Sequence, residues 1–140
     1  MSDLFAMRRE FIARFDIPAP TAPRFTPENL TMWETMLGEE WQEFQQALAD
    51  YKAHDPADTA MSTRLMAELT AEGVDVLNVL VGLLLSQGLP IEAMTRAIHE
   101  ANLKKCVDGH VVRRADGKVL KPPGWQPADK EKVIRQARQD

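Results

Sequence analysis

Apolar side chains recur every three to four residues along most of the chain, which predicts helices rather than strands. The predicted helices cover residues 3–16, Thr26-Pro27-Glu28 to about Ala53, Asp55-Pro56 to Gln87, and 91–105. The second and third helices start where Thr26 or Asp55 precedes a proline, the pattern of an N-cap residue followed by proline at the first helical position. Gly88 is predicted to close the third helix, with Pro90 just beyond that end.

The segments outside these helices contain turn-forming residues. Residues 17–25 carry three prolines and are predicted to form an extended connector. Asp108-Gly109 and Asp116-Gly117 are turn dipeptides on either side of the β-branched pair Val111-Val112, which predicts a small hairpin or flap. A proline-rich crossing and a short basic helix follow. The fold predicted is therefore all-α, a bundle of four to five helices with a hairpin or flap near the C-terminus.

The third helix is unusual because it is apolar on nearly every side. Nine of the twelve residues from Val74 to Leu85 are aliphatic, and Asp75 and Asn78 interrupt them. A helix of this kind is normally buried, so Asp75 and Asn78 are predicted to lie inside the bundle or at the mouth of a cleft. A bundle of four helices cannot easily cover such a helix, so we expect a partner subunit and at least a homodimer.

Length, charge and cysteine usage restrict the classes of protein. The 140 residues fit a single domain, 1–140, and the formal net charge of −4 has no basic cluster that would bind duplex nucleic acid. Cys106 is the single cysteine, so an internal disulfide is excluded. No apolar run is long enough for a membrane span, and the N-terminal residues lack the apolar region of a signal peptide. We expect a soluble cytoplasmic protein.

Two acidic patches are the candidates for chemistry. Glu39, Glu40 and Glu43 fall within one arc of roughly 100° on the second helix, because each residue turns the helix by about 100°. Glu72 and Asp75 are three residues apart and therefore neighbours on one face of the third helix. The first patch alone also fits a solvated acidic face. The second lies in an apolar helix, where an ionised carboxylate needs a partner.

A divalent cation explains these carboxylates better than internal pairing. No Lys or Arg lies between Met66 and Thr95 to pair with Asp75, although a distant partner such as Lys104 remains an alternative. Two carboxylates about 6 Å apart repel by roughly 3 kcal/mol at an effective dielectric constant near 20. Oxygen ligands without histidine or thiolate select Mg²⁺ or Mn²⁺ over Zn²⁺. The sequence therefore predicts a site for Mg²⁺, for which Mn²⁺ can substitute.

The order Glu-Glu-x-x-Glu followed by Glu-x-x-Asp resembles the MazG-like superfamily of all-α nucleoside triphosphate pyrophosphohydrolases. That superfamily includes dimeric dUTPases and phosphoribosyl-ATP pyrophosphohydrolases. The resemblance covers roughly residues 30–127. Besides the carboxylates it includes Asn78, the end of the fourth helix at residues 102–105 and the tail from Asp116 to Trp125.

The resemblance implies a reaction and a set of roles. Such enzymes cleave between the α and β phosphates and release a nucleoside monophosphate and pyrophosphate. The implied metal ligands are Glu39, Glu43, Glu72 and Asp75, with Glu40 as the residue that orients or deprotonates the attacking water. The implied substrate-binding residues are Asn78, Asn102, Lys105, Lys118 and Lys121. Lys104, Arg113 and Arg114 are further candidate cations for the phosphates, and a flap that closes over them would exclude water.

Substrate and alternatives stay open at this level. The resemblance favours house-cleaning of deoxynucleotides with dUTP first, phosphoribosyl-ATP as the alternative and a broad substrate range as a third. It also implies a homodimer or a dimer of dimers. A di-iron protein would require Glu-x-x-His pairs, which the sequence lacks. A non-catalytic helical interaction module is the other alternative, and it leaves the charge of Glu72 and Asp75 unexplained.

Overall fold

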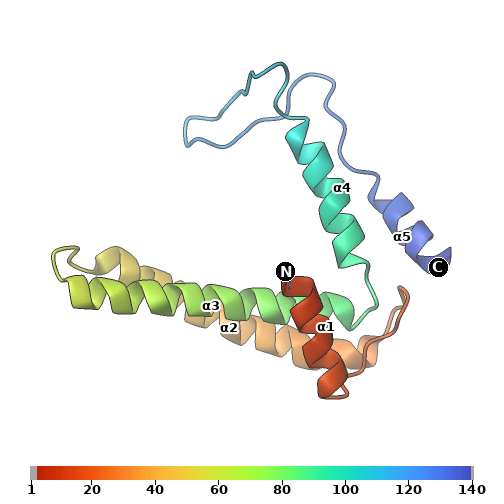
Figure 1. Cartoon of the computed structure of the whole chain (residues 1–140), viewed down its shortest axis with the longest axis horizontal. Helices are drawn as coiled ribbons and strands as arrows, with labels where there is room; N and C mark the ends of the chain where they lie inside the picture. The colour runs from red at the N-terminus through yellow and green to blue at the C-terminus, as the bar shows by residue number, and fades with distance from the viewer. Residues whose placement is uncertain (1–2, 140) are drawn as a thin grey trace. The chain divides into compact units, whose positions relative to one another are not determined.

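The computed structural model describes residues 3–139. Its helices are α1 (Leu4–Arg14), the short 3₁₀ turn η1 (Pro27–Asn29), α2 (Leu30–Ala53), α3 (Thr59–Leu85), α4 (Ile91–Leu103) and α5 (Lys130–Gln139) (Figure 1). Within this range the only β structure is two isolated bridges, so the predicted all-α fold is confirmed. None of the described helices combines the length and the hydropathy that a membrane crossing requires.

The chain divides after Leu89 into two compact units, which are described separately. In the first unit α2 and α3 run side by side in opposite directions, and α1 packs against α3 (Figure 1). The second unit contains α4, a long loop and α5. The prediction that residues 1–140 act as a single domain stays a prediction.

The first residues of α2 and α3 differ from the predicted starts. Asp58, not Asp55, caps α3: its carboxylate accepts from the backbone N–H of Met61 at 3.0 Å. Asp55 instead accepts from the N–H of Ala57 at 2.9 Å and orders the turn before the helix. Thr26 makes no side-chain cap; η1 intervenes between it and α2. Both errors arise because Asp and Thr side chains can bond backbone groups in turns as well as at helix starts.

Thr26 belongs to a buried polar network that fastens the connector to the end of α3. Its hydroxyl donates to the carbonyl oxygen of Ser86 at 2.9 Å. The Gln87 amide accepts from the Thr26 N–H at 2.8 Å and donates to the Thr26 carbonyl at 3.0 Å. All three residues are buried, so each polar group needs such a partner. Gly88 follows with φ of +66°, which confirms its predicted place at the helix end.

The pairing of α2 with α3 depends on one close contact. Trp33 of α2 is 2% exposed, and its indole ring lies directly against Gly82 of α3. A residue without Cβ is required there, because a methyl group at Gly82 would be only 2.2 Å from the ring atom Cζ3. Trp33 is therefore a core residue. The contact fixes the distance and rotation of the two helices that carry the carboxylates.

The single chain does not bury α3 on all sides, which agrees with the expectation that four helices cannot cover it. Val74, Leu77 and Leu80 are 44%, 47% and 39% exposed, and Asp75 is exposed as well. The deeply buried positions, such as Val79, Val81 and Leu85, come from the C-terminal part of the helix. An apolar composition does not bury a helix when too few elements cover it, and within the first unit α2 and α1 are the helices that pack on α3.

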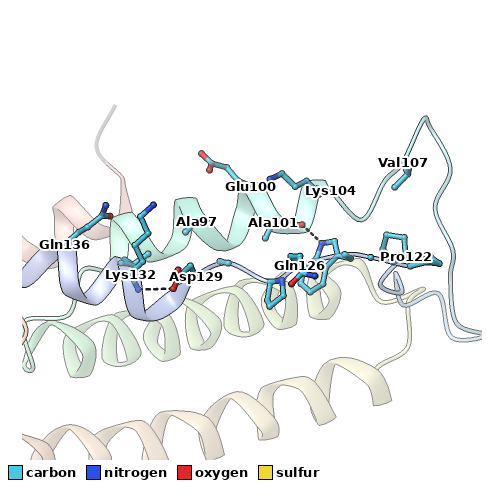
Figure 2. Close-up of a pocket in the computed structure, with 16 residues that line it drawn as sticks. Ala97, Glu100, Ala101, Lys104, Val107, Pro122, Gln126, Asp129, Lys132 and Gln136 are labelled. Atoms are coloured by element: carbon cyan, nitrogen blue, oxygen red, sulfur yellow. Dashed lines mark hydrogen bonds between the residues drawn. The ribbon is translucent and has the colours of Figure 1, made fainter.

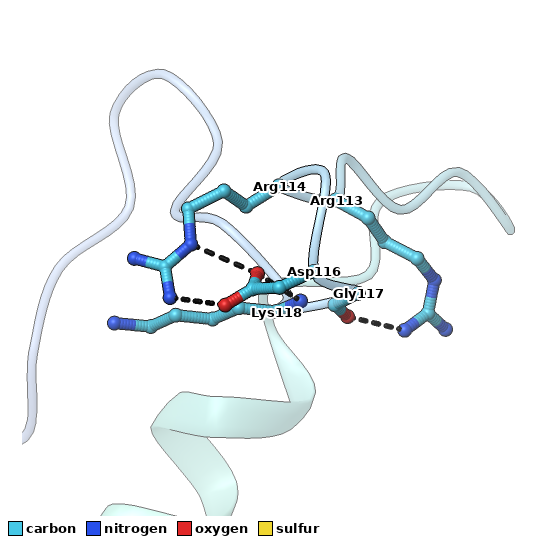
Figure 3. A network of polar contacts seen from close by, with 5 residues as sticks. All are labelled: Arg113, Arg114, Asp116, Gly117 and Lys118. Atoms are coloured by element: carbon cyan, nitrogen blue, oxygen red, sulfur yellow. Dashed lines mark hydrogen bonds and ion pairs between the residues drawn. The ribbon is translucent and has the colours of Figure 1, made fainter.

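The loop of the second unit is ordered by short-range contacts rather than by strands. The predicted hairpin reduces to two bridges, Val107 with His110 and Arg113 with Val119. Between the latter two residues the guanidinium of Arg114 binds both carboxylate oxygens of Asp116, at 2.9 and 2.5 Å (Figure 3). This pairing raises the pKa of Arg114 and lowers the pKa of Asp116. The charge of Arg114 is thus neutralised within its own turn.

Candidate active site

Three carboxylates from two helices converge in the first unit. Glu40 and Glu43 lie one turn apart on α2, and Glu72 faces them from α3. One oxygen from each carboxylate lies within 4.8 Å of the others. This carboxylate triad spans residues far apart in sequence, and the antiparallel pairing of α2 with α3 brings them together.

Two oxygens of the triad are buried without a hydrogen-bond partner. They are Oε2 of Glu40 and Oε2 of Glu72. Burying an acceptor without a partner costs free energy, more so when the group is charged. The unpaired buried oxygens of the triad therefore destabilise the folded chain, and a bound cation would remove this cost by pairing with them.

Burial and crowding both act on the protonation of these groups. Burial raises the pKa of Glu40 above its ordinary value, and the neighbouring charges of Glu43 and Asp75 raise it further. Burial likewise raises the pKa of Glu72, with the charges of Glu43 and Asp75 again next in importance. Each factor disfavours the ionised carboxylate. Clusters of acids with shifted pKa values are typical of functional sites.

The predicted ligands are distributed unevenly around the triad. Glu43 and Glu72 belong to it, and so does Glu40, which was assigned to the attacking water. Asp75 is exposed and outside the triad, yet its charge acts on Glu40 and Glu72. Glu39 is exposed and does not belong to the group. The structure thus places Glu40 among the candidate ligands, which the sequence motif alone did not indicate.

The donor set fits a hard divalent cation. All three groups offer carboxylate oxygens, the ligands that Mg²⁺ and Mn²⁺ prefer, and histidine and thiolate are absent from the cluster. A cation bound here would coordinate the two buried oxygens that have no hydrogen-bond partner, Oε2 of Glu40 and Oε2 of Glu72. A cavity of about 230 Å³ lies beside two of the three carboxylates and is lined by Glu43, Gln46, Ala47, Asp50, Glu68 and Glu72.

The predicted substrate-binding residues fall into both units. Asn78 is half-buried on α3, one turn after Asp75. Asn102 is exposed in the last turn of α4, and Lys118 and Lys121 are exposed in the loop that follows. Lys105 is half-buried just beyond α4. Lys118 projects from the turn that Arg114 and Asp116 order (Figure 3).

Trp125 has a role that the sequence did not reveal. Its indole N–H donates to the carbonyl oxygen of Ala101 at 2.6 Å (Figure 2). The ammonium groups of Lys105 and Lys121 lie 5.0 and 5.4 Å from its ring centroid. Trp125 also lines a cavity of about 690 Å³ between α4 and the segment that leads into α5. The nearby lysines of the motif were visible in the sequence, but their convergence on one ring was not.

Most of the chain matches a known protein family. Residues 8–102 match the family described as Phosphoribosyl-ATP pyrophosphohydrolase. A comparison with individual curated proteins gives no match. The matched segment contains the carboxylate triad, Asp75 and Asn78, and it ends before Lys105. It confirms the resemblance to the MazG-like superfamily and identifies a hydrolase of phosphoric anhydride bonds in nucleotides. The chain belongs to the phosphoribosyl-ATP pyrophosphohydrolase family.

Proposed function

We propose that this protein is a magnesium-dependent pyrophosphohydrolase that cleaves nucleoside triphosphates between the α and β phosphates. The observation that carries the proposal is the carboxylate triad: three acids within 4.8 Å of one another, two of them with buried oxygens that have no partner. In a family that splits pyrophosphate bonds, such a site needs a cation before an anionic triphosphate can approach.

Each carboxylate has a proposed role. Glu43, Glu72 and Asp75 hold the cation together with Glu39, as the motif predicts, and Glu40 joins the ligands or orients the attacking water. Mg²⁺ bound there supplies charge neutralisation at the phosphoryl oxygens and a bound water of lowered pKa. Burial and the neighbouring carboxylates raise the pKa of Glu40, which makes its carboxylate a stronger base than an ordinary glutamate and supports a role as proton acceptor.

The lysines that follow α4 contribute the opposite charge. Lys105, Lys118 and Lys121 are proposed to bind phosphate oxygens, and Asn78 and Asn102 are proposed to bind the substrate by hydrogen bonds. Cationic side chains stabilise phosphoryl oxygens as negative charge shifts during cleavage. Arg114 is a weaker candidate, since its guanidinium is occupied by Asp116.

Two candidate substrates are proposed. dUTP is the first deoxynucleotide to test, as the motif pattern favours. Phosphoribosyl-ATP is the second candidate, and the family match supports it directly. Both contain the same α–β phosphoric anhydride, so the chemistry at the carboxylates is common to them. The base and sugar contacts decide between them.

A homodimer is also proposed. Val74, Leu77 and Leu80 form an exposed apolar strip on α3, the helix that carries Glu72 and Asp75. Exposed apolar strips of this kind are typical of subunit interfaces. A second copy of α3 packed against the strip would bury it by two-fold symmetry.

The test measures pyrophosphate release from dNTPs, NTPs and phosphoribosyl-ATP, each with Mg²⁺ and with EDTA. We expect release that requires Mg²⁺ and that Glu43→Gln and Asp75→Asn reduce at least 100-fold, the scale of losing electrostatic stabilisation in a site. Glu34→Gln, an exposed acid elsewhere on α2, is the charge-matched control and is expected to keep full activity. Release in EDTA, or release that survives Glu43→Gln, would contradict the proposal.

A further inference from the structure

Two lysine ammonium groups gather on one indole ring in the second unit. Lys105 Nζ lies 5.0 Å and Lys121 Nζ 5.4 Å from the centroid of Trp125. The two lysines lie sixteen residues apart in the loop that connects α4 with α5. Trp125 is therefore the residue that brings them together.

The indole ring of Trp125 is held in place by a hydrogen bond to α4 and by a turn in its own backbone. Its N–H donates to the Ala101 carbonyl in the last turn of α4, and the same oxygen also accepts from the backbone N–H of Lys104. The positive φ of Gly124, +77°, turns the backbone immediately before Trp125. The half-buried indole is thus fixed to a helix rather than carried by the loop alone.

The two ammonium groups bring positive charge to the ring without a direct ion pair in the part of the chain that the structure describes. Among residues 3–139 no carboxylate forms an ion pair with either lysine. Two like charges near one ring repel each other, and the attraction of each to the π face offsets only part of that repulsion, because a cation–π contact at an exposed site is weak. A ligand that carries two negative charges would relieve it.

We propose that Trp125 is a positioning residue that holds Lys105 and Lys121 as a paired binding site for a polyphosphate group. The inference rests on the proposed function for its biological ligand, the phosphates of the nucleotide. The binding itself does not depend on the proposed function, because the lysine pair is expected to bind a polyphosphate even without a divalent cation. Trp125 itself acts through the lysines, since its ring faces their ammonium groups and its N–H is used by Ala101.

The geometry favours positioning by Trp125 over stacking on a base. An indole ring that stacks on a nucleobase needs a free face, whereas two cations occupy the surroundings of this ring. Lysine side chains are flexible, and fixing two of them costs conformational entropy at binding. Contacts with the ring reduce that cost before the ligand arrives. The expected signature of losing Trp125 is therefore weaker binding with little change in the chemical step.

The experiment titrates the full-length protein with inorganic tripolyphosphate by calorimetry, in EDTA and at low ionic strength. Trp125→Leu removes the ring, and we expect the dissociation constant to rise about five-fold from loss of two cation–π contacts. Trp125→Phe keeps an aromatic face and is expected to retain most of the affinity. Lys105→Met with Lys121→Met should abolish binding. Lys130→Met, an exposed lysine of α5, is the charge-matched control and should bind normally.

Kinetics give a second readout that a merely structural role would not produce. With the nucleotide that the wild type hydrolyses, Trp125→Leu should raise KM about five-fold and leave kcat within two-fold, with Trp125→Phe restoring KM. Circular dichroism checks that Trp125→Leu is folded; where it is not, the double lysine variant carries the test alone. A wild-type protein that fails to bind tripolyphosphate, or a double lysine variant that binds it normally, would overturn the inference.

The two proposals fail separately. Tripolyphosphate binding in EDTA that depends on Trp125, together with no pyrophosphate release from any nucleotide, would refute the proposed function and support the lysine pair. Magnesium-dependent hydrolysis with a KM that Trp125→Leu does not change would support the function and refute the role of Trp125.

Discussion

The contact between Trp33 and Gly82 gives a prediction of defined size. In Gly82→Ala the new methyl group would lie 2.2 and 2.3 Å from ring atoms Cζ3 and Cη2. Carbon atoms pack at roughly 3.5–4.0 Å, so the ring would have to withdraw by more than about 1 Å. Trp33 is buried, and protein cores are packed with few voids that could take up a displaced ring. We therefore expect α2 and α3 to be pushed apart.

Overpacking of a core typically costs about 1–3 kcal/mol, and the helical preference of alanine over glycine returns about 0.5–1 kcal/mol. A clash at 2.2 Å with a rigid ring belongs to the upper half of that cost, about 2–3 kcal/mol, so the net loss is about 1–2.5 kcal/mol. An unfolding entropy of about 2.1 cal/mol/K per residue gives about 0.3 kcal/mol/K for a chain of this length, so Tm should fall by roughly 3–8 °C.

The chain supplies a matched control of opposite sign. A Cβ at Gly38, within α2, would meet no atom within 4 Å. Gly38→Ala should therefore stabilise the protein by about 0.5–1 kcal/mol. Both variants are compared by thermal and urea unfolding, followed by helical circular dichroism. If Gly82→Ala proves as stable as Gly38→Ala, the close packing of Trp33 on Gly82 is not a feature of the folded protein.

Three further predictions concern the carboxylates, the buried network and the interface. Glu43→Gln should raise Tm in EDTA, because it removes a charge that crowds Glu72, and should abolish the rise in Tm that Mg²⁺ gives the wild type; a variant that Mg²⁺ still stabilises fully would contradict this. Gln87→Leu should cost about 1–3 kcal/mol in urea unfolding, since it leaves the buried backbone N–H of Thr26 without a partner and the Thr26 carbonyl with only its bond from the Asn29 N–H; an unchanged midpoint would show that the network contributes nothing. Leu77→Lys should shift the mass measured by light scattering from dimer to monomer, whereas Lys52→Glu on α2 should leave it unchanged.

The raised pKa values of Glu40 and Glu72 predict how pH acts on the metal-free protein. A carboxyl whose pKa is higher in the folded than in the unfolded state binds more protons when folded, between the ordinary value of 4.5 and the raised value. Folding stability therefore increases as pH falls through that window, and it is lost as pH rises above the raised value. In EDTA, Glu43→Gln should reduce this gain relative to the wild type, because Glu43 contributes to both shifts. Equal pH dependence of Tm in the two proteins would refute the coupling.

Local pattern was sufficient for much of the architecture. The three- to four-residue apolar period placed every long helix, because helix formation depends on neighbours a few residues away. Gly88 ended α3 as predicted, since its left-handed φ favours glycine. The start of α3 was predicted three residues early, because Asp55 and Asp58 offer the same side-chain acceptor and only the folded chain selects between them.

Burial could not be predicted from composition. Val74 to Leu85 has the sequence of a fully buried helix, yet Leu77 is half exposed in one chain. A sequence records that a side chain is apolar, but the area it loses to water depends on which elements reach it. The same limit applies to Asp75, which was predicted to lie inside the bundle or at the mouth of a cleft and is exposed in the single chain.

The sequence by itself determined the helices, the acidic motifs and the family that they indicate, because each of these depends on residue types at fixed short spacings. The tertiary structure determined which acidic side chains lie close together. It placed Glu40 with Glu43 and Glu72, left Glu39 outside, and brought Lys105 and Lys121 to Trp125. The first grouping depends on the rotation of α2 against α3, which the contact of Trp33 with Gly82 establishes. The second depends on the path of the loop between α4 and α5, which the hydrogen bond from Trp125 to Ala101 fastens to α4. Both contacts join residues far apart in sequence and form only when the chain folds.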